Sequence, residues 1–561
     1  MADHRVLLIG LDAATFTVID PLLARGRLPN LARLIRQGVR GELRSTIPPL
    51  TFPAFPSLLT GKNPGKHGIY GPEVLDLTKY QPKTGQPTNS QPIAGQTILD
   101  FLGKRGARVA SYGVPMTTPV WPINGVMVGG FPTPDPWRAY TWPPEFADEV
   151  GPLMPPSIPK PQTGDRDELR EEFLRVKPEL ILPMADYEIE KTTAFLERFV
   201  RSGEYDLVAG VIRVPDYLQH KLWKHREPSY PTYDPKQAAK YGHLIDHYYE
   251  EIDRALGKVF DAAGGWIVAV VSDHGAGHYP TRVFHPNAFL RRAGLLAPVE
   301  RGNVSAARRL MGLVRLAFRV LPIKDLVLQR LPLALHKRLA RVRDLGDTID
   351  WPRTQAFFSP VYHPTCGIVV NLRGRQAQGT VEPGAGYEAV RDRIIAGLKA
   401  LRDPHDGRPI VQEVYRREEL YAGPFVENAP DVIFLTDPIY YGGTRQDTLV
   451  TMTDKRTLDH ASGAHRMEGV LVLHGPGVRA GVEVEGATII DIAPTLLHAA
   501  GWPVPADVDG RVLTAALEPA VAERPVQVGE PLGEGGGARG QYSEEEEESI
   551  RAALKGLGYI G

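Results

Sequence analysis

The residues best suited to chemistry are aspartates and histidines that stand at the ends of predicted strands. Asp12 directly follows an apolar run at residues 5–11, and Asp273 with His274 lies near the end of a second run at 265–275. Short apolar runs of this kind are typical of buried parallel strands. Open α/β sheets bind ligands at the carboxyl ends of their strands, so these side chains are candidates for one common site.

Three further candidates follow the same rule. Asp216 and His220 come after a third run at 206–214, four residues apart, which places both on one face of a helical turn. His465 ends the segment SGAH just before another predicted strand at 468–478. Aspartate oxygens and histidine nitrogens suit Zn²⁺, Mn²⁺ or iron. Each residue alone also fits a cap, a turn or an exposed pair, but one metal site explains all six together.

Thr51 occupies a segment dense in proline and glycine, PPLTFPAFPSLLTGKNPGKHGIYG at residues 48–71. Turn chemistry accounts for the prolines and glycines but not for the threonine. Six ligands suffice for two metal ions if a seventh group completes one of them, and Thr51 is the natural seventh. Metal coordination activates a hydroxyl as a nucleophile, and two ions ~4 Å apart clamp the oxygens of an in-line phosphoryl transfer.

Strands that alternate with helical segments predict an α/β fold with a mostly parallel sheet. Further strand candidates are 107–115 and 431–437, and a helix is expected over 239–264. Residues 72–190 are rich in Pro, Gly, Trp and Tyr and indicate loops or a covering insertion. A second insertion is expected at about 295–350.

The segment 301–343 holds eleven Lys and Arg residues against one acid, Asp325, with apolar residues at helical spacing. This pattern predicts basic amphipathic helices, either a solvated helical subdomain or a surface for an anionic membrane or a partner. We favour the solvated subdomain, since Pro322 and Pro332 interrupt the stretch. Residues 1–517 are expected to form the catalytic domain, and 518–561 a flexible linker with a short terminal helix.

The composition limits the class of protein and its compartment. The 561 residues carry a formal net charge of −1, so no overall field attracts nucleic acid, and none is expected as a partner. The lone cysteine, Cys366, excludes an intrachain disulfide framework and a thiolate-rich metal site. The N-terminal residues lack the pattern of a signal peptide, and no apolar run is long enough to cross a bilayer. We therefore expect a cytoplasmic protein; its oligomeric state is not predicted.

A set of motifs in this order resembles the alkaline phosphatase superfamily. Within it, the sequence is most similar to the type I phosphodiesterase/nucleotide pyrophosphatase branch and to bacterial relatives described as phosphohydrolases or phosphomutases. The resemblance implies an alkaline phosphatase-like, mostly parallel sheet sandwiched by helices, with inserted covering segments. It rests on the segments VLLIGLDAAT, PPLTFPAFPSLLTGKNPGKHGI, VPDYLQH, VSDHGAGH, SGAHRMEGVLVLHGPGV and IIDIAPTLLHAAGWPVPADVDGRVL.

This resemblance assigns roles to the seven candidates. It implies that Thr51 is a nucleophile that forms a covalent phospho-threonine. One metal ion would be bound by Asp12, Thr51, Asp273 and His274, and the other by Asp216, His220 and His465. His460, five residues before His465, competes for the last position. Zn²⁺ is the first expectation for both ions and Mn²⁺ the second.

Phe52 and Lys62 are the candidates for substrate binding. Phe52 follows the nucleophile as an aromatic does in the nucleotide pyrophosphatases, where it lines the pocket; core packing explains it equally well. Those enzymes usually carry an asparagine after HGI, where this sequence has Gly71 and Pro72. Lys62, Lys66 or backbone amides are the alternatives for contacting the phosphate.

Three functions follow from these residues. The first is a two-metal phosphohydrolase for small phosphate esters, with phosphodiesters favoured. The second is a phosphomutase or phosphotransferase that uses the same site with an acceptor other than water. The third is a non-catalytic protein that contacts a membrane or partner through 301–343, which a complete ligand set makes the weakest of the three.

Overall fold

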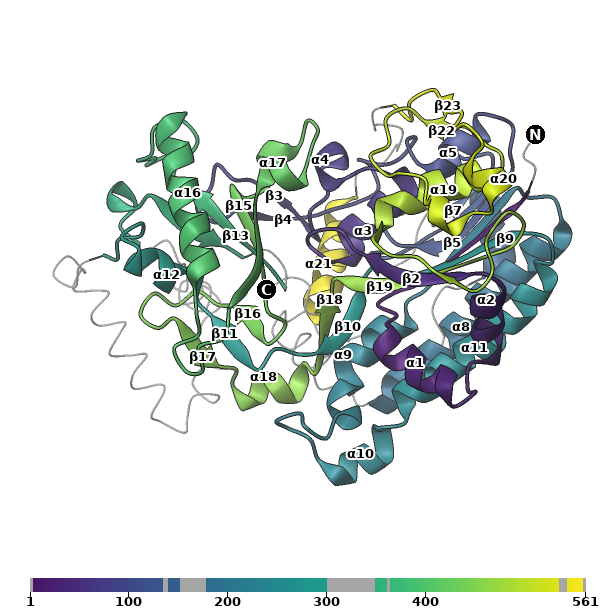
Figure 1. Ribbon diagram of the computed structural model, residues 1–561, viewed down its shortest axis with the longest axis horizontal. Coiled ribbons are helices and arrows are strands. Elements are labelled where there is room, and N and C mark those ends of the chain that lie inside the picture. Colours follow the sequence, from purple (N-terminus) through teal and green to yellow (C-terminus); the bar gives the residue numbers. More distant parts are fainter. Residues whose placement is uncertain are drawn as a thin grey trace.

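The computed structural model describes residues 4–134, 140–151, 178–299, 349–360, 364–533 and 542–557. These residues include a ten-stranded main sheet with helices on both faces (Figure 1). Its strand order is β20-β2-β19-β9-β1-β8-β5-β6-β7, and β21 pairs with β2. The strands are β1 (Val6–Leu11), β2 (Val39–Arg44), β5 (Val109–Val114), β6 (Gly125–Gly129), β7 (Thr141–Trp142), β8 (Leu207–Ile212), β9 (Ile267–Val271), β19 (Glu468–His474), β20 (Val482–Glu483) and β21 (Ala487–Thr488).

The centre of this sheet is parallel, as the sequence predicted. Strand β1 pairs in parallel with both β8 and β9, and β5 pairs in parallel with β8 and β6. Only β19 and β7 run antiparallel to their neighbours within the sheet. The carboxyl ends of β1, β8 and β9 therefore meet at one edge.

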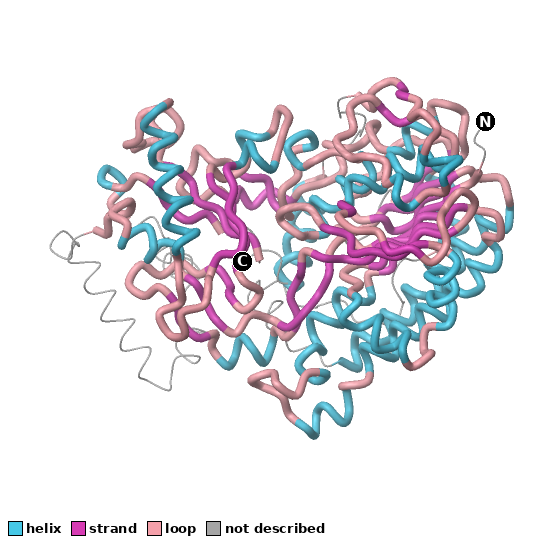
Figure 2. The backbone as a smooth tube through the Cα atoms, in the orientation of Figure 1, coloured by secondary structure: helices cyan, strands magenta, loops and turns pink. Residues whose placement is uncertain are grey.

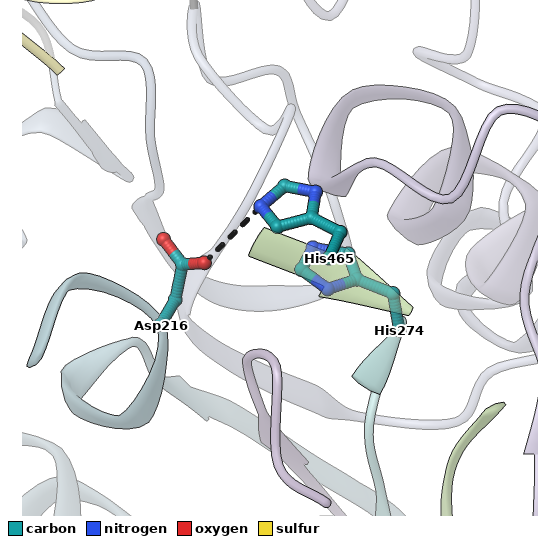
Figure 3. Close-up of side chains that lie close together, drawn as sticks. All are labelled: Asp216, His274 and His465. Carbon is teal, nitrogen blue, oxygen red and sulfur yellow. Dashed lines mark ion pairs between the residues drawn. The ribbon is translucent and has the colours of Figure 1, made fainter. Parts of the chain in front are cut away.

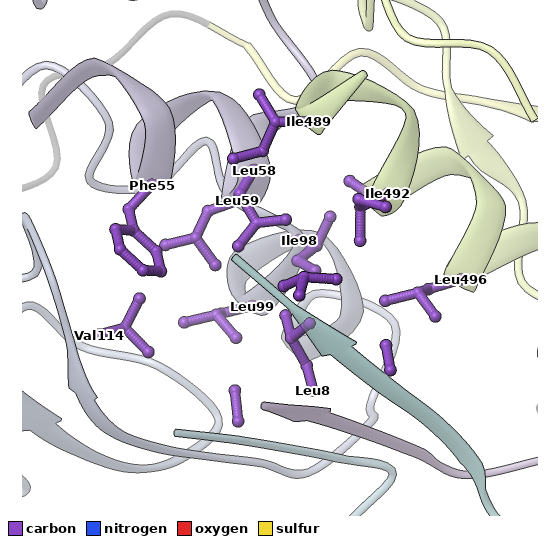
Figure 4. Packing of buried hydrophobic residues seen from close by; sticks show 14 of the residues in the cluster. Leu8, Phe55, Leu58, Leu59, Ile98, Leu99, Val114, Ile489, Ile492 and Leu496 are labelled. Atoms are coloured by element: carbon purple, nitrogen blue, oxygen red, sulfur yellow. The ribbon is translucent and has the colours of Figure 1, made fainter. Parts of the chain in front are cut away.

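Successive residues of a strand point to opposite sides of a sheet, so the apolar strands present hydrophobic side chains on both faces. Helices cover each face. Leu8 of β1 packs into one core with helices α3 (Thr51–Thr60), α5 (Ile98–Gly103), α19 (Ile492–Ala499) and α21 (Glu544–Leu557), part of which is drawn in Figure 4. Leu7 and Ile9 pack into the other core. The helices of that second face are α1 (Phe16–Ala24), α2 (Pro29–Gln37), α8 (Pro178–Ser202), α9 (Val214–Arg226) and α11 (Leu244–Ala262).

A smaller region has a hydrophobic core of its own and lies beside the main sheet, at the left of Figures 1 and 2. It contains an antiparallel four-stranded sheet in the order β12-β13-β15-β14 and a three-stranded sheet in the order β16-β11-β17. Its elements are β11 (Arg282–Phe284), α12 (Pro286–Arg292), β12 (Ala356–Ser359), β13 (Thr365–Val370), α16 (Ala385–Ala400), β14 (Val411–Arg416), β15 (Val432–Thr436), β16 (Tyr440–Gly442), β17 (Val450–Met452) and α18 (Lys455–His460).

A two-stranded antiparallel ribbon connects the two regions along the chain. Strand β10 (Gly275–His278) leaves the main sheet directly after His274 and pairs with β18 (Gly463–Arg466), which leads back into β19. In this register Ala276 lies opposite His465. The ribbon thus carries a predicted ligand from the far end of the sequence back to the edge of the main sheet.

The observed elements differ from the predicted ones in several places. The strand predicted at 107–115 is confirmed as β5, and the rest of 72–190, expected to be loops or a covering insertion, also supplies β6 and β7 to the main sheet. The predicted strand at 431–437 forms β15, which belongs to the smaller antiparallel sheet. The helix expected over 239–264 divides into α10 (Pro235–Tyr241) and α11.

The ends of the insertions and of the tail are only partly described. The basic segment 301–343 lies outside the described residues, as do 534–541 of the tail. Helix α21 is present near the C-terminus, and its Ile550 and Leu554 are fully buried in the main core. Within the described ranges, no helix combines the length and the apolar character needed to span a bilayer.

Candidate metal-dependent active site

All seven predicted metal-site residues come from the edge where the central parallel strands end. Asp12 directly follows β1, Asp273 and His274 follow β9, and Asp216 lies in the first turn of α9, shortly after β8. Thr51 is the first residue of α3. The remaining two, His220 and His465, lie on α9 and in β18.

The first group of converging side chains surrounds His274. Its Nε2 lies 3.4 Å from Thr51 Oγ1, 3.3 Å from Asp273 Oδ2 and 3.7 Å from Asp12 Oδ1. The other ring nitrogen, Nδ1, lies 3.1 Å from the carbonyl oxygen of Gly275. A carbonyl only accepts, so Nδ1 carries the proton and Nε2 turns its lone pair toward the aspartates.

The second group joins His220, His465 and Asp216. The two histidine Nε2 atoms are 2.9 Å apart, and they lie 3.2 Å and 3.4 Å from Asp216 Oδ1. Their Nδ1 atoms lie 2.9 Å and 3.0 Å from the carbonyl oxygens of Gly463 and Pro49. The backbone thus orients both rings so that Nε2 faces the carboxylate, the usual arrangement for histidines that bind a metal.

The two groups adjoin each other. The rings of His274 and His465 stack with their centroids 3.8 Å apart, as Figure 3 shows beside Asp216. Ligand atoms of Asp216, His274 and His465 lie within 4.8 Å of one another. Those of Asp12, Asp273 and His274 do so as well. His274 therefore lies within reach of both positions, although the family resemblance assigned it to the first alone.

The charge of this cluster suits divalent cations. Asp12 Oδ1 and Asp273 Oδ2 are buried and accept no hydrogen bond from the described residues. Burial and neighbouring aspartates raise the pKa of Asp12, and burial raises the pKa of Asp273 to about 7. Burial also acts to raise the pKa of Asp216, but His220 and His465 hold it well below its ordinary value. Buried carboxylate oxygens without donors fit a bound cation.

Phe52 is fully buried in the main core. Its ring contacts Phe131 edge to face, with the centroids 5.6 Å apart. This placement is what core packing, the alternative interpretation of Phe52, would produce.

Lys62 is not brought to the cluster. Its Nζ forms an ion pair with Asp507 Oδ2 at 2.6 Å and donates to Gln96 Oε1 at 2.9 Å, and its side chain is only 4% exposed. Thr51 is the first residue of α3 and Lys62 lies two residues beyond its last, so the length of the helix, about 15 Å, separates them. Lys62 therefore stabilises the far end of α3.

The other conspicuous histidines have structural partners. His67 Nε2 lies 3.0 Å from Ser57 Oγ, and burial together with Lys62 lowers the pKa of His67 to about 3. His285 Nε2 lies 2.9 Å from Thr451 Oγ1. His460 is the last residue of α18 and belongs to neither group of converging ligands.

Arg213 lies at the cluster but was not among the predicted site residues. Its Nε donates to Asp12 Oδ2 at 3.3 Å, so it contacts a predicted metal ligand directly. Arg213 is the residue directly after β8. The rule that selected the other residues at strand ends would therefore have found it.

Solved structures similar to this chain include the following two. Human ectonucleotide pyrophosphatase/phosphodiesterase 5 is 13% identical, with 90% of this chain and 97% of that chain covered and a TM-score of 0.43. Phosphonoacetate hydrolase from Sinorhizobium meliloti, in complex with phosphonoacetate, is 16% identical, with 89% and 96% covered and a TM-score of 0.46. Among curated proteins, no sequence matches.

A family model identifies the chain more directly. The model of type I phosphodiesterase/nucleotide pyrophosphatase matches residues 6–457, which is well over half of the sequence and includes six of the seven clustered residues. The seventh, His465, lies just beyond the match. The protein therefore belongs to the type I phosphodiesterase/nucleotide pyrophosphatase family, whose members are metal-dependent enzymes that hydrolyse phosphate ester bonds.

Proposed function

We propose that this protein cleaves phosphodiesters of small molecules through Thr51, with two divalent metal ions in the cluster. The observation that carries the proposal is the convergence of Thr51 Oγ1, Asp273 Oδ2 and Asp12 Oδ1 on His274 Nε2, at 3.4, 3.3 and 3.7 Å. A free hydroxyl is a weak nucleophile, and coordination to a cation would activate it by lowering its pKa.

The ligand groups suit the two proposed ions. Asp12, Thr51, Asp273 and His274 would bind one ion, and Asp216, His220 and His465 the other. These oxygen and nitrogen ligands suit Zn²⁺ first and Mn²⁺ second. Ions bound here would lower the pKa of the threonine hydroxyl and offset the negative charge of the phosphoryl oxygens.

The position of Thr51 on its helix also favours a phosphate ester. Thr51 opens α3, and the preceding Leu50 supplies no side-chain cap. The N-terminal end of a helix carries a partial positive charge and attracts phosphoryl groups. A substrate phosphate placed there would have its phosphorus next to Thr51 Oγ1.

Cleavage would then proceed in two displacements. Thr51 Oγ1 gives up its proton to solvent and forms a bond to phosphorus while the bond from phosphorus to the leaving alcohol breaks, and that alcohol takes up a proton from solvent. Water next attacks the phospho-threonine, which releases a phosphate monoester and restores the hydroxyl. The buried side chains of the cluster hold the nucleophile in one orientation throughout.

The test compares hydrolysis of bis(p-nitrophenyl) phosphate and p-nitrophenyl phosphate by protein loaded with Zn²⁺ or Mn²⁺. Thr51→Ala should lower kcat/KM for the diester by at least about 10³-fold, since the nucleophile is absent. Thr60→Ala is the matched control, because Thr60 is buried on the same helix and donates only to Pro56. It should keep activity within a few fold.

The products distinguish the hydrolase from the alternative transferase. Release of a phosphate monoester as the sole product in the presence of alcohol acceptors supports hydrolysis. Transfer to an acceptor in preference to water would support the phosphotransferase or phosphomutase alternative. Full diester cleavage by Thr51→Ala would contradict the proposal.

A further inference from the structure

Arg213 is held in place on three sides at the edge of the cluster. Its backbone N–H donates to the carboxylate of Glu188, and its guanidinium carbon lies 3.8 Å from the centroid of the Phe131 ring. Its Nε donates to Asp12 Oδ2, and its side chain is 17% exposed. Because the backbone N–H, the flat face of the guanidinium and its Nε all have partners, its orientation is fixed.

Arg213 acts on one specific oxygen of Asp12. It binds Oδ2, whereas Oδ1 of the same carboxylate accepts no hydrogen bond from the described residues and lies 3.7 Å from His274 Nε2. A carboxylate held by one oxygen cannot rotate freely, so the other oxygen keeps pointing at the cluster. Such outer partners orient metal ligands, and their loss typically weakens metal binding.

Phe131 connects this contact to the nucleophile helix. One face of its ring lies under Arg213, and the ring also contacts Phe52, the residue after Thr51. Arg213, which binds Asp12, and Phe52 at the start of α3 thus contact the same aromatic ring. Replacing this ring should disturb the Arg213 side chain without removing its charge.

We propose that Arg213 is a positioning residue that orients Asp12 for one of the two metal ions, with Phe131 as its support. The inference rests on the proposed function, because it assumes that Asp12 binds metal. It predicts that a change at Arg213 weakens one metal position and leaves the position of Asp216, His220 and His465 unchanged.

The experiment measures Zn²⁺ binding to metal-free protein by competition with a chromophoric chelator. Arg213→Gln should weaken one of two Zn²⁺ equivalents by about 10- to 100-fold and leave the second unchanged. Arg213→Lys keeps the charge but loses the planar group that stacks on Phe131, so it should weaken the same equivalent by about 10-fold. Phe131→Leu should give an effect between wild type and Arg213→Gln.

Arg226→Lys is the matched control. Arg226 is the last residue of α9, the helix that begins directly after Arg213; its Nε donates to Asp246 Oδ1 at 3.0 Å, and its side chain is 20% exposed. It contacts none of the clustered residues in this way, so both Zn²⁺ equivalents should bind as in wild type. Thermal unfolding of each metal-free variant shows whether the fold is retained.

The outcomes separate this inference from the proposed function. Wild-type protein that binds two equivalents while Arg213→Gln also binds both normally would overturn only the role of Arg213. Equal weakening of both equivalents would also overturn it, since that indicates a general structural defect. A wild-type protein that binds no Zn²⁺ would overturn the two-metal proposal and this inference together.

Discussion

Asp273 at the edge of the main sheet and Asp431 in the smaller region are both buried carboxylates beside a strand. Asp431 is bound by Arg375 through two nitrogens, at 2.5 and 2.8 Å, and by the hydroxyl of Tyr387 at 2.6 Å. Asp273 instead lies beside Asp12, and its Oδ2 accepts no hydrogen bond from the described residues. In the smaller region an arginine side chain neutralises the buried carboxylate. At the edge of the main sheet two buried aspartates lie side by side, an arrangement that a bound metal cation would stabilise.

Asp403 shows the same contrast through its pKa. Burial alone would raise the pKa of Asp403, but donors from His405, Tyr440 and Arg282 hold it below the ordinary value. The pKa of Asp273, which has no arginine partner among its contacts, is raised to about 7. Buried carboxylates occur in both regions, so burial alone does not identify the candidate metal site. The distinguishing feature is a buried carboxylate oxygen that accepts no hydrogen bond from the described residues.

Metal removal should lower activity more than any other change, and it should leave the smaller region unaffected. Dialysis against a chelator is expected to lower kcat/KM for the diester by about 10³-fold or more, because the hydroxyl of Thr51 is then a poor nucleophile. Returning Zn²⁺ or Mn²⁺ should restore activity. If elemental analysis shows that the protein is metal-free and it is still active, the proposed difference between the two regions is wrong.

Neutralising each buried aspartate should affect stability in opposite ways. Asp431→Asn leaves the buried Arg375 without its carboxylate partner and removes one of three carboxylate partners of Arg417, which should cost about 3–5 kcal/mol of unfolding free energy. Asp273→Asn removes one of several neighbouring negative charges, so the metal-free protein should be unchanged or about 1–2 kcal/mol more stable. Urea unfolding of metal-free protein at pH 8 measures both.

The same pair of variants should respond differently to zinc. Wild type and Asp431→Asn are expected to gain stability when Zn²⁺ is added in excess, about 2.7 kcal/mol at 100 times Kd. Asp273→Asn should lose most of that gain. A metal-free Asp273→Asn protein destabilised as strongly as Asp431→Asn would show that Asp273 is a structural residue like Asp431.

Neutral buried histidines should make both regions sensitive to acid. The pKa of His67 is lowered to about 3, so below its ordinary value of 6.5 the unfolded chain takes up a proton that the folded chain does not. This stability is complete above pH 6.5 and is lost as the pH falls toward 3, at about 1.4 kcal/mol per pH unit. His67→Asn should reduce the loss between pH 6 and 4.5 by roughly 2 kcal/mol.

His285 provides the matching measurement in the smaller region. Burial and Arg445 lower its pKa to about 4, so His285→Asn should reduce the acid sensitivity by a smaller amount. Urea unfolding at several pH values gives both slopes. Unchanged slopes in both variants would mean that other groups cause the acid sensitivity.

Lys62 should give the smallest effect on activity. Lys62→Met removes the ion pair with Asp507, whose side chain is 26% exposed, and should cost about 1–3 kcal/mol of stability. Diester kcat/KM should stay within about twofold, since Lys62 lies at the opposite end of α3 from Thr51. A loss of activity above 10-fold in a stable variant would return Lys62 to the substrate site.

The sequence predicted the parallel centre of the sheet and its ligand edge because both depend on local patterns. Apolar runs mark β1, β8 and β9, and the residues after them are placed by the geometry of parallel strands. Strand β2 was missed because the prediction relied on apolar runs, whereas its charged Arg40, Glu42 and Arg44 alternate with buried residues. Such alternation is typical of a half-buried strand, not of a fully buried one.

Long-range pairing explains most of the remaining errors. Cys366 in β13 pairs with Phe434 in β15, and nothing local to either segment predicts this partner. Lys62 was one alternative for the phosphate contact of the missing asparagine, but helix α3 separates it from Thr51. Arg213 contacts Asp12 from a distance of 201 residues, and only the order of strands in the sheet brings them together.

The register of the β10–β18 ribbon decides which chemical group reaches the cluster. Ala276 lies opposite His465, and Gly275 lies opposite Arg466. Neighbouring strand residues point to opposite faces, so a slip of one position would replace an imidazole with either a methyl group or a guanidinium. The ribbon therefore cannot adjust the second metal position gradually: either the pairing is correct and the ligand set is complete, or that position loses a ligand altogether.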